Sequence, residues 1–325
     1  MDIQRFFSTI DAHIGGEPLR IVTGGIPPVS GSTMKEKLEY FQRHFDSVRK
    51  ILLQEPRGHR GMRAAVITSA DNGISGFGMI MMDNGGYRFR GLSAMSAAAA
   101  ALETGIIPIR GEQTTAAIDT PWGTVTVTAA CCGTEVQSVQ YAEQPAFVLE
   151  ERRMNVALHE RPVQVAVASC GRPIAVVDCG QLALKLEIAS IPEFNRLARS
   201  ILEHLTKLVG AESVVFADLS APPGSAVRCT AADRSGNVAR MPDTAELGSC
   251  MALLRHKRVP LGGEKVIFEG ISGGRLAALA DEASQSGGNR PDAIVPVFTG
   301  RAFITGTHQF VLDPTDQIGE GFVLS

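Results

Sequence analysis

The chain has 325 residues, of which 44% are hydrophobic and 20% are charged, and its formal net charge is −3. This composition is typical of a globular protein with a large core and excludes a disordered or fibrous one. Lysine and arginine are scattered along the chain, so neither nucleic acid nor a membrane surface is an expected partner.

The length exceeds that of a usual single core and predicts two domains of about 150 residues, with a ligand cleft between them as the default site. Residues 1–10 lack the apolar run of a secretory signal, and no stretch approaches a membrane-spanning length. We therefore expect a cytoplasmic protein. The six cysteines, of which only Cys131 and Cys132 are adjacent, match neither a disulfide framework nor a zinc site, which predicts buried, reduced thiols.

The first half of the chain reads as strands at 19–25, 64–68 and 74–82, with an amphipathic helix at 35–53 between the first two. After a glycine turn at 84–86, the pattern changes to small residues that include five consecutive alanines. This segment predicts a compact helix that close neighbours can surround, ending at Gly105.

The second half repeats this plan. Residues 120–148 alternate as a hairpin pair, and the charged run 150–153 is the expected joint between domain 1–150 and domain 151–309. Two strands at 163–178, a helix at 191–209 and strands at 214–217 and 226–230 follow. A second small-residue helix is expected at 243–255, with strands beyond it, and the end of the chain, 310–325, is expected to rejoin the first domain.

Each half therefore combines strands, a surface helix, a glycine turn and a small-residue helix. Such a helix can lie inside a curled sheet without steric conflict, which predicts an α+β fold of two pseudo-symmetric, β-barrel-like halves, each around a central α-helix. Periodicity alone leaves a generic α+β protein as the alternative.

Four sequence blocks carry a family resemblance. Residues 11–18 read Asp-Ala-His-Ile-Gly-Gly-Glu-Pro, residues 55–59 read Glu-Pro-Arg-Gly-His, residues 81–87 read Met-Met-Asp-Asn-Gly-Gly-Tyr, and residues 304–314 read Ile-Thr-Gly-Thr-His-Gln-Phe-Val-Leu-Asp-Pro. In this order and spacing the chain resembles the proline racemase family, which includes 4-hydroxyproline epimerases and trans-3-hydroxyproline dehydratases. The resemblance implies a diaminopimelate-epimerase-like fold, a small amino-acid-like or carboxylate substrate between the halves, and no cofactor or metal. A homodimer is the candidate assembly.

The racemases of this family are expected to use two thiols, each in a loop that leads into a central helix, to move a proton across one substrate carbon. If one residue is deleted after Tyr87, the first thiol position falls on Arg90, followed by Gly91 and Leu92 as substrate-binding positions. A guanidinium is not deprotonated at working pH and cannot be the base. Two interpretations stay open: Arg90 is an anion clamp, or it is ion-paired where catalysis has been lost.

The second thiol position falls without a gap on Asp243. In the same match, the aspartate that holds the substrate's ring nitrogen becomes Ala239, and Thr244 and Ala245 are further substrate-binding positions. Asp243 would be a general base if desolvation raised its pKa. The spacing of Asp243 and Glu246 before an apolar residue also has the form of a capping box, and we favour this interpretation.

Three functions remain open. The protein is a lyase or isomerase with Asp243 as base and Arg90 as anion clamp, or a catalytically inactive binding or structural relative in which Arg90 and Asp243 form an ion pair. The third is an ordinary proline or hydroxyproline epimerase or dehydratase, if the alignment at the site is wrong. Three histidines in the matched blocks are expected to be structural hydrogen-bonding residues: His13, His59 and His308.

Overall fold

A computed structural model describes residues 5–323, apart from 72, 158, 183, 221, 223, 260–264 and 282–291. The chain divides into two compact units. The N-terminal unit comprises Met1–Ile14, Pro18–Gln140 and Arg301–Ser325, and the C-terminal unit comprises Gly15–Glu17 and Tyr141–Gly300. From the sequence, the expected domain boundaries are residues 150 and 309. The charged run 150–153 lies within a strand, where three of its four side chains are exposed to solvent.

The N-terminal unit is a curled sheet around one helix. Strand β1 pairs antiparallel with β17, β2 pairs in parallel with β3, and β3 continues through β4, β6 and β7 to β8. Helix α2 contacts β1, β3, β6, β7 and β17. The elements of this unit are β1 (Arg5–Ile14), β2 (Glu17–Gly24), α1 (Met34–Leu53), β3 (Arg63–Thr68), β4 (Phe77–Asp83), β5 (Gly86–Tyr87), α2 (Gly91–Glu103), β6 (Gln113–Thr120), β7 (Gly123–Cys132), β8 (Glu135–Ala142) and β17 (Ala302–Leu312).

Helix α2 is buried along its whole length up to Leu102, as the small-residue pattern predicts. Alanine and serine side chains let the surrounding strands approach the helix axis closely. Helix α1 instead buries one face, which includes Phe41, Val48 and Leu52, and its start carries a capping box of Thr33 and Glu36. The two helices therefore have different roles: α2 is the core of the unit, and α1 covers strands β3 and β4.

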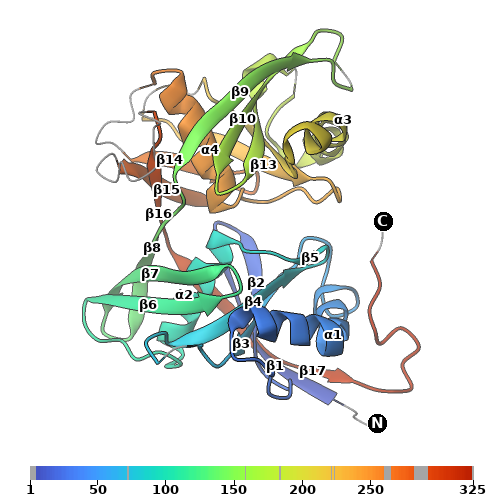
Figure 1. Cartoon of the computed structure of the whole chain (residues 1–325), viewed down its shortest axis with the longest axis vertical. Helices are drawn as coiled ribbons and strands as arrows, with labels where there is room; N and C mark the ends of the chain where they lie inside the picture. Colours follow the sequence, from blue (N-terminus) through green and yellow to red (C-terminus); the bar gives the residue numbers. More distant parts are fainter. Residues whose placement is uncertain are drawn as a thin grey trace. The chain divides into compact units, whose positions relative to one another are not determined.

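The C-terminal unit has the same plan. Helix α4 contacts β9, β10, β11, β12 and β16, and α3 packs on β12 and β13 (Figure 1). Gly248 lets α4 approach β10, because a Cβ atom there would lie 2.7 Å from the Cys170 sulfur. The elements are β9 (Ala146–Met154), β10 (Val163–Cys170), β11 (Pro173–Asp178), η1 (Cys179–Gln181), η2 (Ile188–Ser190), α3 (Ile191–Val209), β12 (Ser213–Ala217), β13 (Val227–Asp233), α4 (Thr244–His256), β14 (Val266–Gly270), β15 (Arg275–Asp281) and β16 (Val295–Gly300).

The predicted α+β architecture is confirmed: each unit consists of strands around a central small-residue helix. Among the described residues, no helix is long and apolar enough to cross a membrane. Each central helix begins at one of the two positions that the sequence singles out, since Arg90 immediately precedes α2 and Asp243 immediately precedes α4.

Candidate functional site

Arg90 is the N-cap residue of α2, but its side chain does not cap the helix. Its backbone N–H donates to the Met81 sulfur at 3.4 Å, and its guanidinium lies 3.8 Å from an Asp83 carboxylate oxygen. The side chain is only 9% exposed. Arg90 is therefore a buried, ion-paired residue at the positive end of a helix.

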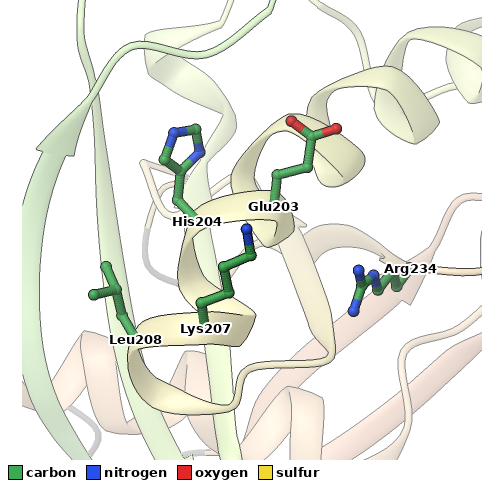
Figure 2. Close-up of a pocket in the computed structure, with 5 residues that line it drawn as sticks. All are labelled: Glu203, His204, Lys207, Leu208 and Arg234. Atoms are coloured by element: carbon green, nitrogen blue, oxygen red, sulfur yellow. The ribbon is translucent and has the colours of Figure 1, made fainter.

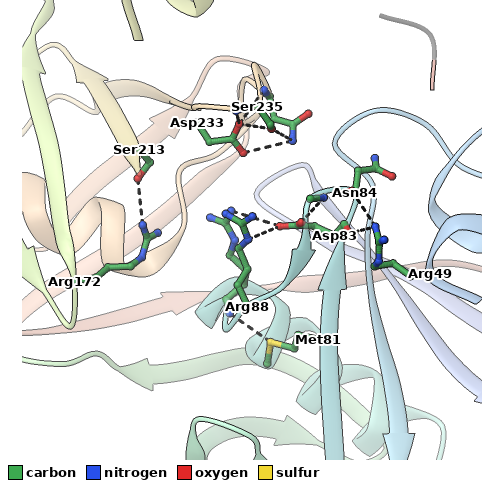
Figure 3. Close-up of polar contacts among 12 residues, drawn as sticks. Arg49, Met81, Asp83, Asn84, Arg88, Arg172, Ser213, Asp233 and Ser235 are labelled. Carbon is green, nitrogen blue, oxygen red and sulfur yellow. Dashed lines mark hydrogen bonds and ion pairs between the residues drawn. The ribbon is translucent and has the colours of Figure 1, made fainter. Parts of the chain in front are cut away.

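A second arginine shares the same carboxylate. Arg88 Nε lies 3.0 Å from Asp83 Oδ2, and the N–H of Gly85 donates to Asp83 Oδ1 at 2.8 Å. Figure 3 shows the Arg88 and Asp83 side chains facing each other beside Met81. Two guanidinium groups around one carboxylate leave a net positive charge, and the dipole of α2 adds to it. Sequence reasoning missed Arg88 and Asp83, although both lie in or next to the matched block 81–87.

Aromatic rings lie beside this helix start. Phe89 precedes Arg90, and its ring lies 6.4 Å from that of Trp122, which is 45% exposed in the turn between β6 and β7. Trp122 is the single tryptophan of the chain. We therefore expect its fluorescence to respond to changes at the α2 start.

Asp243 is the N-cap residue of α4 and is 2% exposed. The Glu246 carboxylate accepts a hydrogen bond from the Asp243 N–H at 2.8 Å, and the Asp243 side chain accepts one from the Glu246 N–H. The predicted capping box is thus confirmed. It uses backbone N–H groups of the first turn of α4, the groups that a substrate carboxylate would otherwise contact.

Glu143, in the connection between β8 and β9, is a buried carboxyl group that sequence reasoning missed. It accepts hydrogen bonds from the Thr244 hydroxyl at 2.6 Å, the Gln144 N–H at 3.0 Å and the Tyr141 hydroxyl at 3.3 Å. Burial raises the pKa of Glu143, and the charge of Asp243 raises it further, while the Thr244 hydrogen bond acts in the opposite direction. No sequence signal marks Glu143, because 101 residues separate it from Thr244.

The start of α4 therefore carries three carboxyl groups, from Glu143, Asp243 and Glu246. One nearby cation, Arg172, lies 3.5 Å from a Glu246 oxygen and also donates to the Ser213 hydroxyl at 3.4 Å (Figure 3). Thr244 is fully buried, and its hydroxyl is committed to Glu143. In contrast to the start of α2, this helix start is acidic.

The cysteines have the properties of packing residues, with one exception. Cys170 packs against α4 at Gly248, and its Sγ donates to the Gln144 carbonyl at 3.3 Å. Burial raises the pKa of Cys170 well above the usual range and that of Cys179 to about 12, so both are protonated thiols at neutral pH. Burial of Cys132 is a wrong prediction: it is exposed, because it follows Cys131 in β7 and adjacent strand residues point to opposite faces.

Each of the three histidines of the matched blocks has a neighbouring residue that it contacts. His13 stacks on Phe303, His59 Nδ1 lies 2.8 Å from the Arg60 carbonyl, and His308 lies 3.6 Å from an Asp11 carboxylate oxygen. Their structural role stays a prediction. Within the described part of the chain, no group of three histidine, cysteine or acidic side chains is arranged to hold a metal ion.

A surface hollow lies between α3 and Arg234, which follows β13 (Figure 2). All the residues that line it are exposed, and none is a predicted site residue. It is therefore a surface feature rather than the candidate site. Its lining residues are Glu203, His204, Lys207, Leu208 and Arg234.

Comparisons with known proteins agree with this fold and these motifs. A hydroxyproline epimerase from Agrobacterium vitis, solved with bound trans-4-hydroxy-L-proline, superposes with a TM-score of 0.85 at 24% identity, over 100% of this chain and 96% of that one. This likeness confirms the expected diaminopimelate-epimerase-like fold.

Sequence relatives define the family. The chain is 32% identical to a trans-3-hydroxy-L-proline dehydratase of Bacillus cereus and 30% identical to a proline racemase of Acetoanaerobium sticklandii, in each case over 100% of both proteins. The family model described as proline racemase matches residues 9–323. The chain therefore belongs to the proline racemase family.

Proposed function

We propose that the protein binds an amino-acid-like or carboxylate small molecule at the start of α2, and that it does not exchange an α-proton through paired thiols. One observation carries this proposal. The residues immediately before the two central helices are Arg90 and Asp243, both buried and both held by neighbouring charged groups. Neither is a thiol, and an arginine cannot take up a proton from carbon.

The start of α2 suits an anion. A guanidinium presents a fork of N–H donors that matches a carboxylate, and Arg90 and Arg88 together exceed the charge of Asp83. Gly91 and Leu92 supply the first backbone N–H groups of the helix, where anions bind favourably. We assign the anionic group of the ligand to Arg90, Gly91 and Leu92.

The start of α4 does not suit an anion. Its three carboxyl groups would repel a carboxylate. Ala239 and Ala245 are half-buried and stay our proposed ligand contacts at this helix. The Thr244 hydroxyl donates to Glu143, so Thr244 would influence the ligand through that carboxyl group. The relatives' names, proline racemase and trans-3-hydroxy-L-proline dehydratase, support an amino acid as the ligand class.

A second candidate is a lyase or isomerase in which Asp243 takes up the α-proton and Arg90 holds the substrate anion. The place of Asp243 favours it, because Asp243 stands immediately before α4, at the position that the family match assigns to the second thiol. The confirmed capping box weighs against it, since Asp243 already has a structural role. An ion pair between Arg90 and Asp243 stays a prediction.

Proton exchange and binding, measured together, separate the candidates. The native protein is incubated in deuterium oxide with L-proline, trans-3-hydroxy-L-proline and trans-4-hydroxy-L-proline. Exchange and dehydration are followed by NMR, and binding by calorimetry and Trp122 fluorescence. We expect binding of at least one of these ligands without α-proton exchange, epimerisation or dehydration.

Two other outcomes would change the assignment. Exchange that is lost in Asp243→Asn would establish the lyase or isomerase with Asp243 as base. Exchange with proline or hydroxyproline that persists in Asp243→Asn would establish ordinary epimerisation or dehydration and overturn the proposal. A Trp122→Phe variant controls for fluorescence changes that are unrelated to the α2 start.

A further inference from the structure

Residues Gly15–Glu17, which form the turn after β1 and the first residue of β2, belong to the C-terminal unit. The Glu17 side chain is 3% exposed, and Glu17 Oε1 accepts hydrogen bonds from the N–H of Arg240 at 2.5 Å and of Met241 at 3.1 Å. These two residues belong to the loop 239–243 that leads into α4. One buried carboxylate thus binds two consecutive backbone donors of a segment more than 220 residues away in the sequence.

Glycines allow the backbone to approach this loop closely. At Gly15, with φ +60°, a Cβ atom would lie 3.2 Å from Met241 Cγ, and at Gly270 it would lie 2.1 Å from the Arg240 carbonyl oxygen. A Cβ atom at Gly274 would lie 2.1 Å from the Gly15 carbonyl oxygen. A side chain at Gly270 would therefore collide with the backbone of the loop, and one at Gly274 would collide with the backbone of Gly15.

The start of the loop is also held. The Ala239 N–H donates to the Ala231 carbonyl, and the Thr230 hydroxyl donates to the Ala239 carbonyl, each at 2.7 Å. Arg240 and Met241 follow, and the Glu17 carboxylate binds both of their N–H groups. Without that acceptor, donors in a largely buried segment would lose their hydrogen bonds, which costs more than a lost exposed bond.

We propose that Glu17 is a positioning residue: its carboxylate fixes the loop 239–243 and thereby orients Asp243 and the capping box at the start of α4. This inference rests on the proposed function only in that Ala239, the first residue of the loop, is a proposed ligand contact. The orientation of the loop can be measured without any ligand.

Variants at position 17 separate the hydrogen bonds from the charge. Glu17→Gln keeps an oxygen acceptor at almost the same place and removes the charge, whereas Glu17→Ala removes both. Glu17→Asp keeps the charge but shortens the side chain by one methylene group. If two acceptor contacts position the loop, the glutamine variant should behave like the native protein, and the alanine variant should not.

The test is amide hydrogen exchange of the full-length protein, with mass-spectrometric readout of residues 237–245 and of α3. In Glu17→Ala we expect at least tenfold faster exchange at Arg240, Met241 and Asp243, and little change in α3. In Glu17→Gln we expect exchange within about twofold of the native rate. Glu212→Ala, at an exposed glutamate of the same unit, is the matched control.

Several results would overturn the inference. One is native-like protection of residues 240–243 in Glu17→Ala, and another is acceleration that is equal in α3, which would mean general destabilisation. If Glu17→Ala does not fold, Glu17→Asp takes its place, with the same expectation and the same contrary results. Calorimetry with trans-4-hydroxy-L-proline is a separate measurement: absence of binding to the native protein counts against the proposed ligand site and leaves the exchange result standing.

Discussion

The two central helices begin in similar local structure but with opposite charge. Each is a buried helix of small residues preceded by an extended N-cap residue. At α2 that residue is Arg90, which shares Asp83 with Arg88, and at α4 it is Asp243, which lies beside two further carboxyl groups. The fold therefore determines where a functional group stands, while a few side chains decide which chemistry is available there.

Replacement of Arg90 tests whether the positively charged start of α2 binds the ligand, and it should have the largest effect. If Arg90 holds the ligand's anion, Arg90→Ala should weaken binding by about 10- to 150-fold, because hydrogen bonds to charged groups contribute about 1.5–3 kcal/mol. Arg90→Lys should retain the charge but lose the fork geometry and give an intermediate affinity. Trp122 fluorescence titration measures the affinity. Equal losses in Arg90→Ala and in the exposed control Arg110→Ala would contradict the assignment.

Replacement of Asp243 tests whether this residue is a structural cap of α4. Asp243→Ala should lower the free energy of unfolding by about 1 kcal/mol, the usual cost of a lost N-cap, and Asp243→Asn should retain most of it. Denaturant unfolding measures the change. Thr33→Ala, which removes the corresponding cap of α1, provides the matched comparison on a surface helix. No loss of stability in Asp243→Ala would mean that the cap is unimportant and would favour a catalytic role.

The raised pKa of Glu143 predicts a pH dependence. Because the folded-state pKa lies above the usual value of 4.5, the stability that the protonated group provides is present below 4.5 and is lost as pH rises through the raised value. In Glu143→Gln the side chain does not titrate, so this loss of stability with rising pH does not occur. The stability of the variant relative to the native protein should therefore increase from pH 4.5 upward, as measured by unfolding at several pH values. A constant difference across pH would show that Glu143 does not titrate abnormally.

Thiol labelling should show the smallest effect. It tests whether the thiol beside the acidic start of α4 is unreactive. Iodoacetamide should modify the native protein once, at the exposed Cys132, and Cys132→Ser should abolish the rapid reaction. Cys170 should stay unmodified, because burial and the charge of Glu143 both raise its pKa. Mass spectrometry identifies the labelled peptide. Rapid labelling of Cys170 would indicate a reactive thiol beside α4 and reopen thiol chemistry in this unit.

Sequence alone determined the features that depend on local patterns. The small-residue runs predicted both central helices, the amphipathic periodicity predicted α1, and the spacing of Asp243 and Glu246 predicted the cap. The helices and the cap could be predicted because helix periodicity and capping involve residues that are three or four positions apart. The family resemblance, and not a local pattern, placed Arg90 and Asp243 at the starts of the two central helices.

Only the tertiary structure decided the partners of these residues. Glu143 contacts Thr244 across 101 positions, and Glu17 contacts Met241 across 224, so no local pattern could reveal either contact. The same holds for the burial that raises the pKa of Glu143, because burial depends on packing among strands from distant parts of the chain. The sequence therefore predicted the charge at each helix start only in part. The remaining charged neighbours are brought there by folding, because they lie far away in the sequence.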